Sequence, residues 1–227
     1  MTTRNSDEAK DEYVRVMGQE LGTQFAALWQ EVVSLHLKWG EYCELFAEKT
    51  ERVTMLNRAA PVFFHLIQDM LWRELLLHIA RLTDVPKTLG NKNLTIQNFS
   101  SLVADPALRS AVQLLLKETA AKTKFCRDWR NRHIAHQDLD LTINENAKQL
   151  EMANRQFVRE ALCMISATMN EIQAHFNMGE TWYRGITSAG GALSLLYVID
   201  DGLKARAERE ARLVRGEWTP EDARRQI

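Results

Sequence analysis

The chain has 227 residues, of which 45% are hydrophobic and 26% charged, and ten glycines and four prolines are too few for the many turns of an all-β fold. This length allows one large domain to bury its own core without disulfides or metals. The formal net charge of −1 excludes a protein that coats nucleic acid non-specifically, because such binding needs many lysine and arginine contacts with phosphates.

Cysteine usage and the first residues predict a soluble protein of the cytoplasm. The three cysteines, Cys43, Cys126 and Cys163, are odd in number and lie in helical patterns, which favours buried, reduced thiols over a disulfide framework. Residues 1–10 lack the apolar segment of a signal peptide, and no apolar run approaches the roughly 18 residues of a membrane span. We therefore expect no membrane contact.

Apolar residues recur at helical spacing along the chain, and strand-like alternation is absent. The spacing predicts a first helix over residues 7–46, bent near Gly40, and a second over residues 51–83. Residues 84–101 contain proline, glycine and several asparagines, which favour a loop between long helices. A loop of this length is long enough to be functional.

The Asp105-Pro106 pair is typical of a helix start, with a capping carboxylate followed by proline at the first helical position. The third helix should run from there to about Ala135. Further helices are predicted over residues 147–176 and 192–215, and the last of them ends in interleaved arginine and glutamate.

These elements predict an all-α, up-down bundle of about five long helices. We expect residues 1–180 to form the bundle. Residues 181–227 should add a C-terminal helix that packs on the bundle and ends in a charged, mobile segment.

Residues 117–136 are the strongest basic stretch of the chain. They read KETAAKTKFCRDWRNRHIAH, with six lysine or arginine residues and two acidic ones. A charge run alone is most often a solvated helix face, but here the apolar stripe that starts at Val112 ends in Arg130 and His133. An arginine withdrawn from water needs an anionic or carbonyl partner, so Arg130 is either in a structural ion pair or available to a phosphate. The carboxylates considered for such a pair are Asp69, Asp84 and Asp128.

Arg130 and Asn131, followed after four residues by His136, resemble the R-polar-x(3–5)-H motif of HEPN proteins. The resemblance extends to the abortive-infection, AbiU-like branch of that family and covers most of residues 25–175. Outside the motif it is carried by Trp29, Leu35, His36, Trp39, Tyr42, Phe63, Phe64, Leu71, Trp72, the run from Ala80 to Asp84, and the run from Asn93 to Thr95.

The resemblance implies an HEPN-like homodimer that cuts RNA without a metal or other cofactor, with Arg130 and His136 acting at a cleft between the two protomers. Such a protein would be a toxin or phage-defence factor, with a cognate antitoxin as a further partner and RNA contacted by the basic residues 117–136. His136 would be the acid or base, Arg130 would bind the scissile phosphate, and Asn131 would orient one of them. Accessory candidates are His133, Arg127, Arg132 and Asp84.

Helix geometry gives two ways of assembling this site. At about 100° per residue, Arg130 and His136 lie about 120° apart on a continuous helix, so they do not converge within one chain. Either the helix ends before His136 or two chains share the site. One cleft that exposes both side chains favours catalysis. An Arg130 sealed in an ion pair with Asp84 favours a non-catalytic scaffold that binds nucleotides, RNA or a protein partner.

Other candidate groups have simpler interpretations. The histidines His36, His65, His78 and His175 are isolated at helical spacing, and we interpret them as structural. The tryptophans, Trp72 and Trp129 among them, are expected to be core or dimer anchors. A metal bound by His133, His136, Asp138 and Asp140 is conceivable, but their spacing matches no common site and we expect none.

Overall fold

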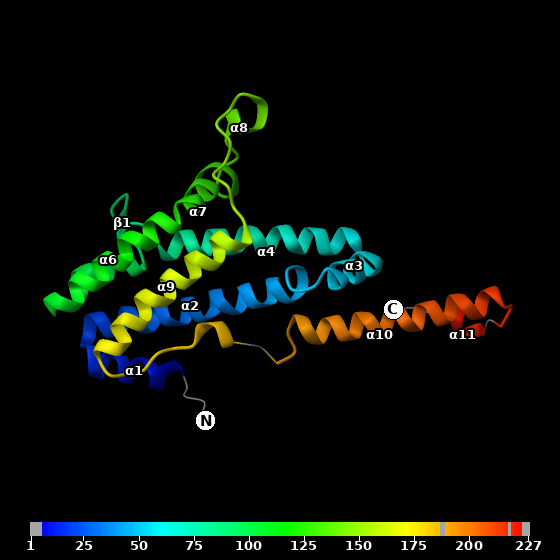
Figure 1. Ribbon diagram of the computed structural model, residues 1–227, viewed down its shortest axis with the longest axis horizontal. Coiled ribbons are helices and arrows are strands. Elements are labelled where there is room, and N and C mark those ends of the chain that lie inside the picture. The colour runs from blue at the N-terminus through cyan, green and yellow to red at the C-terminus, as the bar shows by residue number, and fades with distance from the viewer. Residues whose placement is uncertain (1–5, 187–188, 218, 224–227) are drawn as a thin grey trace. The chain divides into compact units, whose positions relative to one another are not determined.

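A computed structural model describes residues 6–186, 189–217 and 219–223 of the chain (Figure 1). It is predominantly helical, which confirms the predicted all-α bundle. The helices up to residue 82 are α1 (Ser6–Met17), α2 (Gln19–Phe46), α3 (Thr50–Ala59) and α4 (Pro61–Leu82). The later helices are α5 (Phe99–Leu102), α6 (Pro106–Lys122), α7 (Lys124–Trp129), α8 (Leu139–Ile143), α9 (Arg155–His175), α10 (Ala192–Val214) and α11 (Pro220–Ala223).

Shorter elements connect these helices. Two 3-10 turns are η1 (Ile96–Asn98) and η3 (Tyr183–Gly185), and a π-helical turn is η2 (Arg130–Ile134). Two strands, β1 (Lys87–Thr88) and β2 (Asn91–Lys92), form an antiparallel hairpin in the predicted loop after α4, with Lys87 opposite Lys92. Within the described parts of the chain, none of the helices combines the length and hydropathy that a membrane span requires.

The described residues divide into two compact units, and the division falls inside α2 and α4. The first unit lies within residues 1–38 and 72–186, and the second within residues 39–71 and 187–227. The predicted division after residue 180 stays a prediction. Residues 224–227, at the end of the predicted mobile segment, lie outside the described residues.

The predicted first helix is interrupted at Gly18, whereas α2 continues through Gly40, where a bend was expected. Gly18 has a φ of 85°, a left-handed conformation that favours glycine. The chain reverses there, and α1 packs back on the start of α2, where the rings of Tyr13 and Phe25 are 4.9 Å apart. Gly22 permits this approach, since a Cβ at that position would lie 2.4 Å from the Tyr13 carbonyl oxygen.

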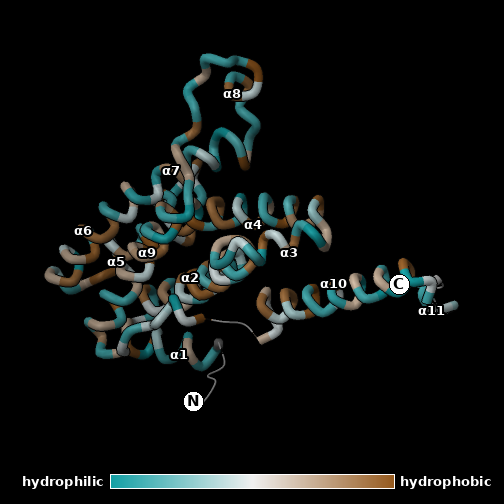
Figure 2. Tube along the Cα trace, turned by 45° about the vertical axis from the view of Figure 1, so that its right-hand side comes forward, coloured by the Kyte–Doolittle hydropathy of each residue, from teal (hydrophilic) through white to brown (hydrophobic). Residues whose placement is uncertain are grey.

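The core of the first unit is formed by the buried faces of α2, α4, α6 and α9, and α6 packs along α9. Hydrophobic and hydrophilic residues alternate along the long helices, as expected for amphipathic elements (Figure 2). The stripe predicted from Val112 is buried within its own chain, and it comprises Val112, Leu116, Thr119, Thr123 and Cys126. The hydroxyls of Thr119 and Thr123 donate to backbone carbonyls one turn earlier, which satisfies them in the core.

The burial expected of the cysteines holds for Cys43 and Cys126. It is wrong for Cys163, which is exposed.

The third and fourth helices differ from their predicted bounds. Asp105 caps α6 as predicted, since its carboxylate accepts from the Leu108 N–H at 2.7 Å. The helix is not continuous to Ala135, however, because it breaks at Thr123 and passes into the π-helical turn. The fourth helix begins at Arg155 rather than near residue 147, where the Asn154 side chain accepts from the Phe157 N–H. The segment that contains α8 therefore projects from the bundle (Figure 1).

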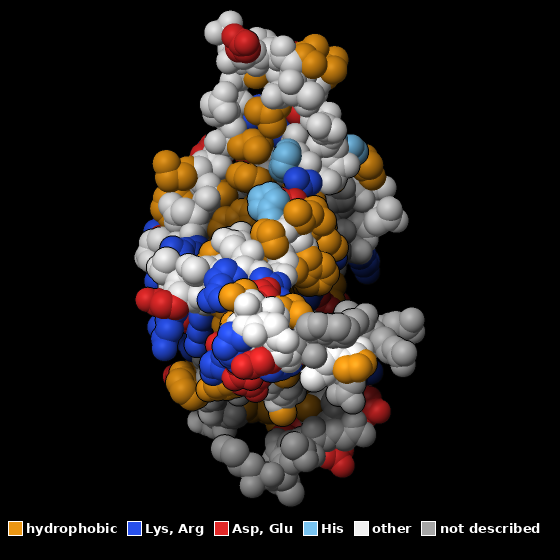
Figure 3. Space-filling model, turned by 90° about the vertical axis from the view of Figure 1, so that its right-hand side faces the viewer, with side chains coloured by type: hydrophobic (Ala, Val, Ile, Leu, Met, Phe, Trp, Pro, Cys, Tyr) orange, Lys and Arg blue, Asp and Glu red, His pale blue; other side chains and the backbone are white. Residues whose placement is uncertain are grey.

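In the second unit, α10 covers nearly the whole of the predicted fifth helix and packs against α3. The first half of α4 exposes an apolar row of Val62, Phe63, Leu66 and Met70. Figure 3 views the molecule from the end at which α4 begins, and hydrophobic side chains gather on the face that it shows.

Candidate functional site

The motif residues lie where α7 passes into the π-helical turn. Arg130 opens the turn, and its carbonyl accepts from the Ala135 N–H at 2.8 Å, five residues later. Turns of this kind are rare and recur at functional sites. The turn ends at Ile134, so His136 follows outside the helix. The helix therefore ends before the histidine, as the first of the two alternatives requires. A site shared by two chains stays a prediction.

The Arg130 guanidinium is held by two side chains of the first unit. Its Nη1 forms an ion pair with Asp84, which lies just after α4, and its Nε donates to the Asn131 amide oxygen at 2.9 Å. Asp84 is thus the partner among the three carboxylates considered. The Arg130 and Asp84 side chains are 23% and 20% exposed, so the pair is half-buried and only partly accessible to solvent.

This ion pair explains why the buried stripe of α6 and α7 ends in an arginine. A guanidinium drawn partly out of water is costly unless a carboxylate or another acceptor replaces the lost solvation. Asp84 supplies that acceptor where the stripe reaches the end of α4. The polar end of the stripe is therefore satisfied within one chain.

The two histidines of the motif region have different surroundings. His136 is exposed. His133 is half-buried, and its ring meets that of Trp129 edge-on, with the centroids 5.4 Å apart. His133 also lines a cavity of about 480 Å³, together with Trp129, Arg132, Gln137, Leu141, Thr142, Gln149 and Leu150.

Two other histidines are buried, in agreement with a structural role. His36 lies 2.8 Å from the Ser166 hydroxyl and stacks on Tyr183, and burial, assisted by the charge of Arg184, lowers the pKa of His36 to about 4. Burial and the nearby ammonium of Lys38 lower the pKa of His78. Both imidazoles are therefore neutral at physiological pH.

The accessory arginines brace the backbone on either side of the motif. Arg127 donates to the Ala120 carbonyl at 2.6 Å and to the Thr123 hydroxyl at 3.2 Å, across the break between α6 and α7. Arg132 contacts the carboxylate of Asp138 at 3.2 Å and the Lys148 carbonyl at 2.6 Å. The contacts of Arg132 position the projecting segment. Because Arg127 and Arg132 are engaged in these contacts, Arg130 is the guanidinium of this region that we consider for phosphate binding.

The four residues considered for a metal, His133, His136, Asp138 and Asp140, do not form a metal-ligand group. The Asp138 carboxylate accepts from the Leu141 N–H at 3.1 Å and caps α8, and hydrogen bonds from Leu141 and Arg132 lower the pKa of Asp138. Throughout the described residues, no three histidine, cysteine, aspartate or glutamate side chains come together as a potential metal-ligand group.

A second cavity of the first unit, of about 360 Å³, shares Asp84 with the motif. His78 lines it, with its Nε2 2.9 Å from the Glu31 carboxylate and its Nδ1 3.3 Å from the Lys38 ammonium. His78 is therefore not isolated, contrary to what its sequence surroundings predict. The sequence signal for this cluster is the spacing of His78 from Glu74, four residues earlier on the same helix, because Glu74 also contacts Lys38.

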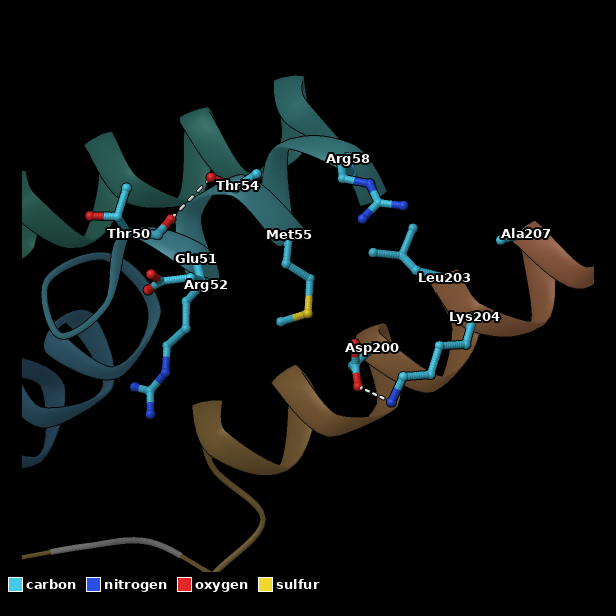
Figure 4. Close-up of a pocket in the computed structure, with 10 residues that line it drawn as sticks. All are labelled: Thr50, Glu51, Arg52, Thr54, Met55, Arg58, Asp200, Leu203, Lys204 and Ala207. Atoms are coloured by element: carbon cyan, nitrogen blue, oxygen red, sulfur yellow. Dashed lines mark hydrogen bonds and ion pairs between the residues drawn. The ribbon is translucent and has the colours of Figure 1, made fainter.

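A larger cavity, of about 640 Å³, lies in the second unit between α3 and α10 (Figure 4). Met55 points into it, and an Asp200–Lys204 ion pair lies along its α10 side. Its lining residues include neither a histidine nor any motif residue. Size alone therefore does not make it the candidate catalytic site.

The HEPN_AbiU2 family model, described as AbiU2, matches residues 18–185. No curated protein and no solved structure gives a significant match. The matched range contains the π-helical turn, His136 and the Asp84 partner of Arg130. Because the match covers most of the chain, this protein belongs to the AbiU2 family, an abortive-infection branch of the HEPN superfamily.

Proposed function

We propose that this protein is a metal-independent endoribonuclease of the cytoplasm that acts as a toxin or phage-defence protein, with a cognate antitoxin as a partner. The observation that carries the proposal is that Arg130, Asn131 and His136 lie on and directly after one π-helical turn, with His136 exposed. Single π turns are frequent at functional sites, and these side chains suit phosphate chemistry.

The proposed reaction is the attack of a ribose 2′-oxygen on the adjacent phosphorus. The new bond joins the 2′-oxygen to phosphorus, and the bond from phosphorus to the 5′-oxygen breaks. A base takes the proton of the 2′-hydroxyl, and an acid donates one to the leaving oxygen. His136 serves as one of these proton carriers, with His133 as the candidate for the other. The Arg130 guanidinium stabilises the additional negative charge on the phosphorane.

Asp84 prepares Arg130 for this task. A charged side chain that is already held in position loses less conformational freedom when a phosphate arrives. The phosphate must share the guanidinium with Asp84 or displace it, and the partial exposure of the pair leaves part of the guanidinium accessible to it. Asn131, which accepts from the Nε of Arg130, limits rotation of the same group.

We expect a metal-free nuclease assay to test the activity directly. Purified protein in EDTA should cut single-stranded or looped RNA and leave 2′,3′-cyclic phosphate and 5′-hydroxyl ends, because the proposed reaction uses the 2′-hydroxyl. DNA lacks this group and should remain intact. Mass spectrometry of the fragments identifies the ends. An RNA-cleaving activity that separates from the protein on further purification would contradict the proposal.

The projecting segment supports a homodimer with contacts near the motif. On α8, the side chains of Leu139 and Ile143 are each 70% exposed. Exposed apolar side chains clustered on a projection are typical of an interaction surface, and two-fold pairing would cover the same residues on both chains. Since α8 follows His136 closely, such a dimer would bring two copies of the candidate site toward each other.

A variant with both Leu139→Asp and Ile143→Asp is expected to be a monomer under conditions in which the wild type is a dimer. Burying two carboxylates in an apolar interface is unfavourable. Sedimentation velocity measures the change. The matched control is Leu114→Asp, at a 60% exposed leucine of α6, which should leave the dimer intact. A wild type that sediments as a monomer at tens of micromolar refutes the dimer.

The alternative is a non-catalytic HEPN-like scaffold that binds nucleotides, RNA or a protein partner. The ion pair of Arg130 with Asp84 favours it, because the pair satisfies the guanidinium without a ligand. In that case the motif stabilises the end of α7, and substitutions that remove the positive charge of Arg130 should lower stability.

A further inference from the structure

The cavity of about 360 Å³ beside Asp84 has the features of a ligand site. It is lined by Glu31 from α2, by His78 and Arg81 from α4, and by Lys92 and Leu94 from the segment after the β-hairpin turn. Its volume lies at the lower end of the range for small-molecule sites, which suits a group the size of a nucleobase.

The hydrogen bonds of His78 define how Glu31 faces this cavity. The Lys38 ammonium has only donors, so the His78 Nδ1 that lies 3.3 Å away must be an acceptor. The ring proton is therefore on Nε2, which donates to the Glu31 Oε2 at 2.9 Å. His78 is 1% exposed, whereas the Glu31 side chain is 44% exposed. A buried, neutral imidazole thus orients a carboxylate that solvent can reach.

A carboxylate held in this way selects partners with two adjacent donors. The Watson–Crick edge of guanine offers N1–H and N2–H side by side, which match the two oxygens of a carboxylate. Adenine and cytosine offer a donor next to an acceptor, and uracil offers one donor between two acceptors. For those bases, one carboxylate oxygen would face another acceptor. Bases in single-stranded RNA are free to be read along this edge.

We propose that this cavity binds a guanine base of the RNA, with Glu31 as the specificity-determining residue. The inference rests on the proposed function, in which Arg130 holds the scissile phosphate. Asp84 connects the two places, because it lines the cavity and pairs with Arg130. The guanine would then belong to a nucleotide that flanks the cleaved bond.

Two cations at the cavity suit the phosphate of the same nucleotide. The Arg81 side chain is 55% exposed, and it lies 3.9 Å from the Glu31 Oε2. Lys92 is exposed and lies opposite Lys87 in the hairpin. Like charges placed opposite each other across two strands repel, and an anion bound between or beside them would relieve this repulsion.

Binding of nucleoside monophosphates to the full-length His136→Ala variant tests the proposal without relying on cleavage. Guanosine 5′-monophosphate should bind at least about 10-fold more tightly than the adenosine, cytidine and uridine monophosphates, as measured by titration calorimetry. Its addition should also shift the imidazole NMR signals of His78, which donates to Glu31.

Adding Glu31→Gln should weaken guanosine monophosphate binding by about 10-fold or more, because an amide replaces one of the two acceptors with a donor. Glu118→Gln, at an exposed glutamate of α6, is the matched control and should bind like its parent. Lys92→Ala offers a second variant at an exposed hairpin position, and it should weaken all four monophosphates together. Equal binding of the four bases, or a guanine preference that survives Glu31→Gln, overturns the proposal.

Cleavage mapping separates this proposal from the nuclease assignment. If wild-type protein cuts RNA without regard to guanine, and guanosine monophosphate shows no preference, the guanine site is wrong and the nuclease assignment stands. If guanosine monophosphate binds selectively while RNA remains uncut, the nuclease assignment is wrong and the guanine site stands.

Discussion

Replacing His136 with alanine is expected to lower the rate of RNA cleavage by about 10²-fold or more, the usual effect of losing a general acid or base. His136 lies outside the π-helical turn and is exposed, so little packing is lost with its imidazole. The helical circular dichroism signal and the melting temperature should therefore remain close to those of the wild type. Initial rates on a fluorescent single-stranded RNA measure the effect.

A second exposed histidine provides the control for this experiment. His65 lies on α4 and is also exposed, and His65→Ala should cleave RNA at the wild-type rate. Equal loss in the two variants would indicate a general effect on the protein rather than the removal of a proton carrier. Full activity in His136→Ala would refute the catalytic role of His136.

Much of the bundle follows from the sequence because helix periodicity is a local property. The Asp105 cap and the span of α10 agree with the spacing of apolar residues and with simple capping rules. The position of the first break does not follow in this way. Gly18 and Gly40 both could interrupt a helix, and only the packing of α1 on α2 determines that Gly18 takes the positive φ.

The π-helical turn was beyond sequence reasoning for a related reason. A periodicity of about 100° per residue assumes one hydrogen-bond pattern, whereas a π turn shifts the bond by one residue. The residues just before the turn contact residues that are distant in the sequence. Trp129 donates from its indole to the Glu151 carbonyl at 2.8 Å, and Asp128 accepts from the Glu151 N–H at 2.8 Å. These same contacts hold residues before α9 in an irregular segment, which explains the late start of that helix.

The candidate site was predictable as a set of residue types but only in part as a geometry. A half-buried arginine needs an anionic partner, and Asp84, one of the three carboxylates predicted for this role, is the partner of Arg130. Which of the three carboxylates pairs with Arg130 depends on the tertiary packing that places the end of α4 beside α7. The link from Lys38 to His78 and Glu31 joins α2 to α4, and nothing in the spacing along either helix specifies which turns face each other.

Replacing Arg130 with lysine is expected to lower RNA cleavage on the order of 10²-fold, as for the loss of a transition-state donor. Lysine keeps the positive charge and can still pair with Asp84. It lacks the planar fork that contacts Asp84 and Asn131 at once and that can grip two phosphate oxygens. The dimer and the melting temperature should change little, which sedimentation and thermal unfolding monitor.

This substitution discriminates between the two functions because they need different properties of Arg130. A scaffold needs only a cation beside Asp84, so Arg130→Lys should then bind its partners nearly as the wild type does. A nuclease needs the geometry of the guanidinium. Arg159→Lys, at an exposed arginine of α9, is the matched control and should have no effect in either case. If the wild type cuts RNA and both His136→Ala and Arg130→Lys retain full activity, the motif is not the catalytic site, and the scaffold explains its ion pair better.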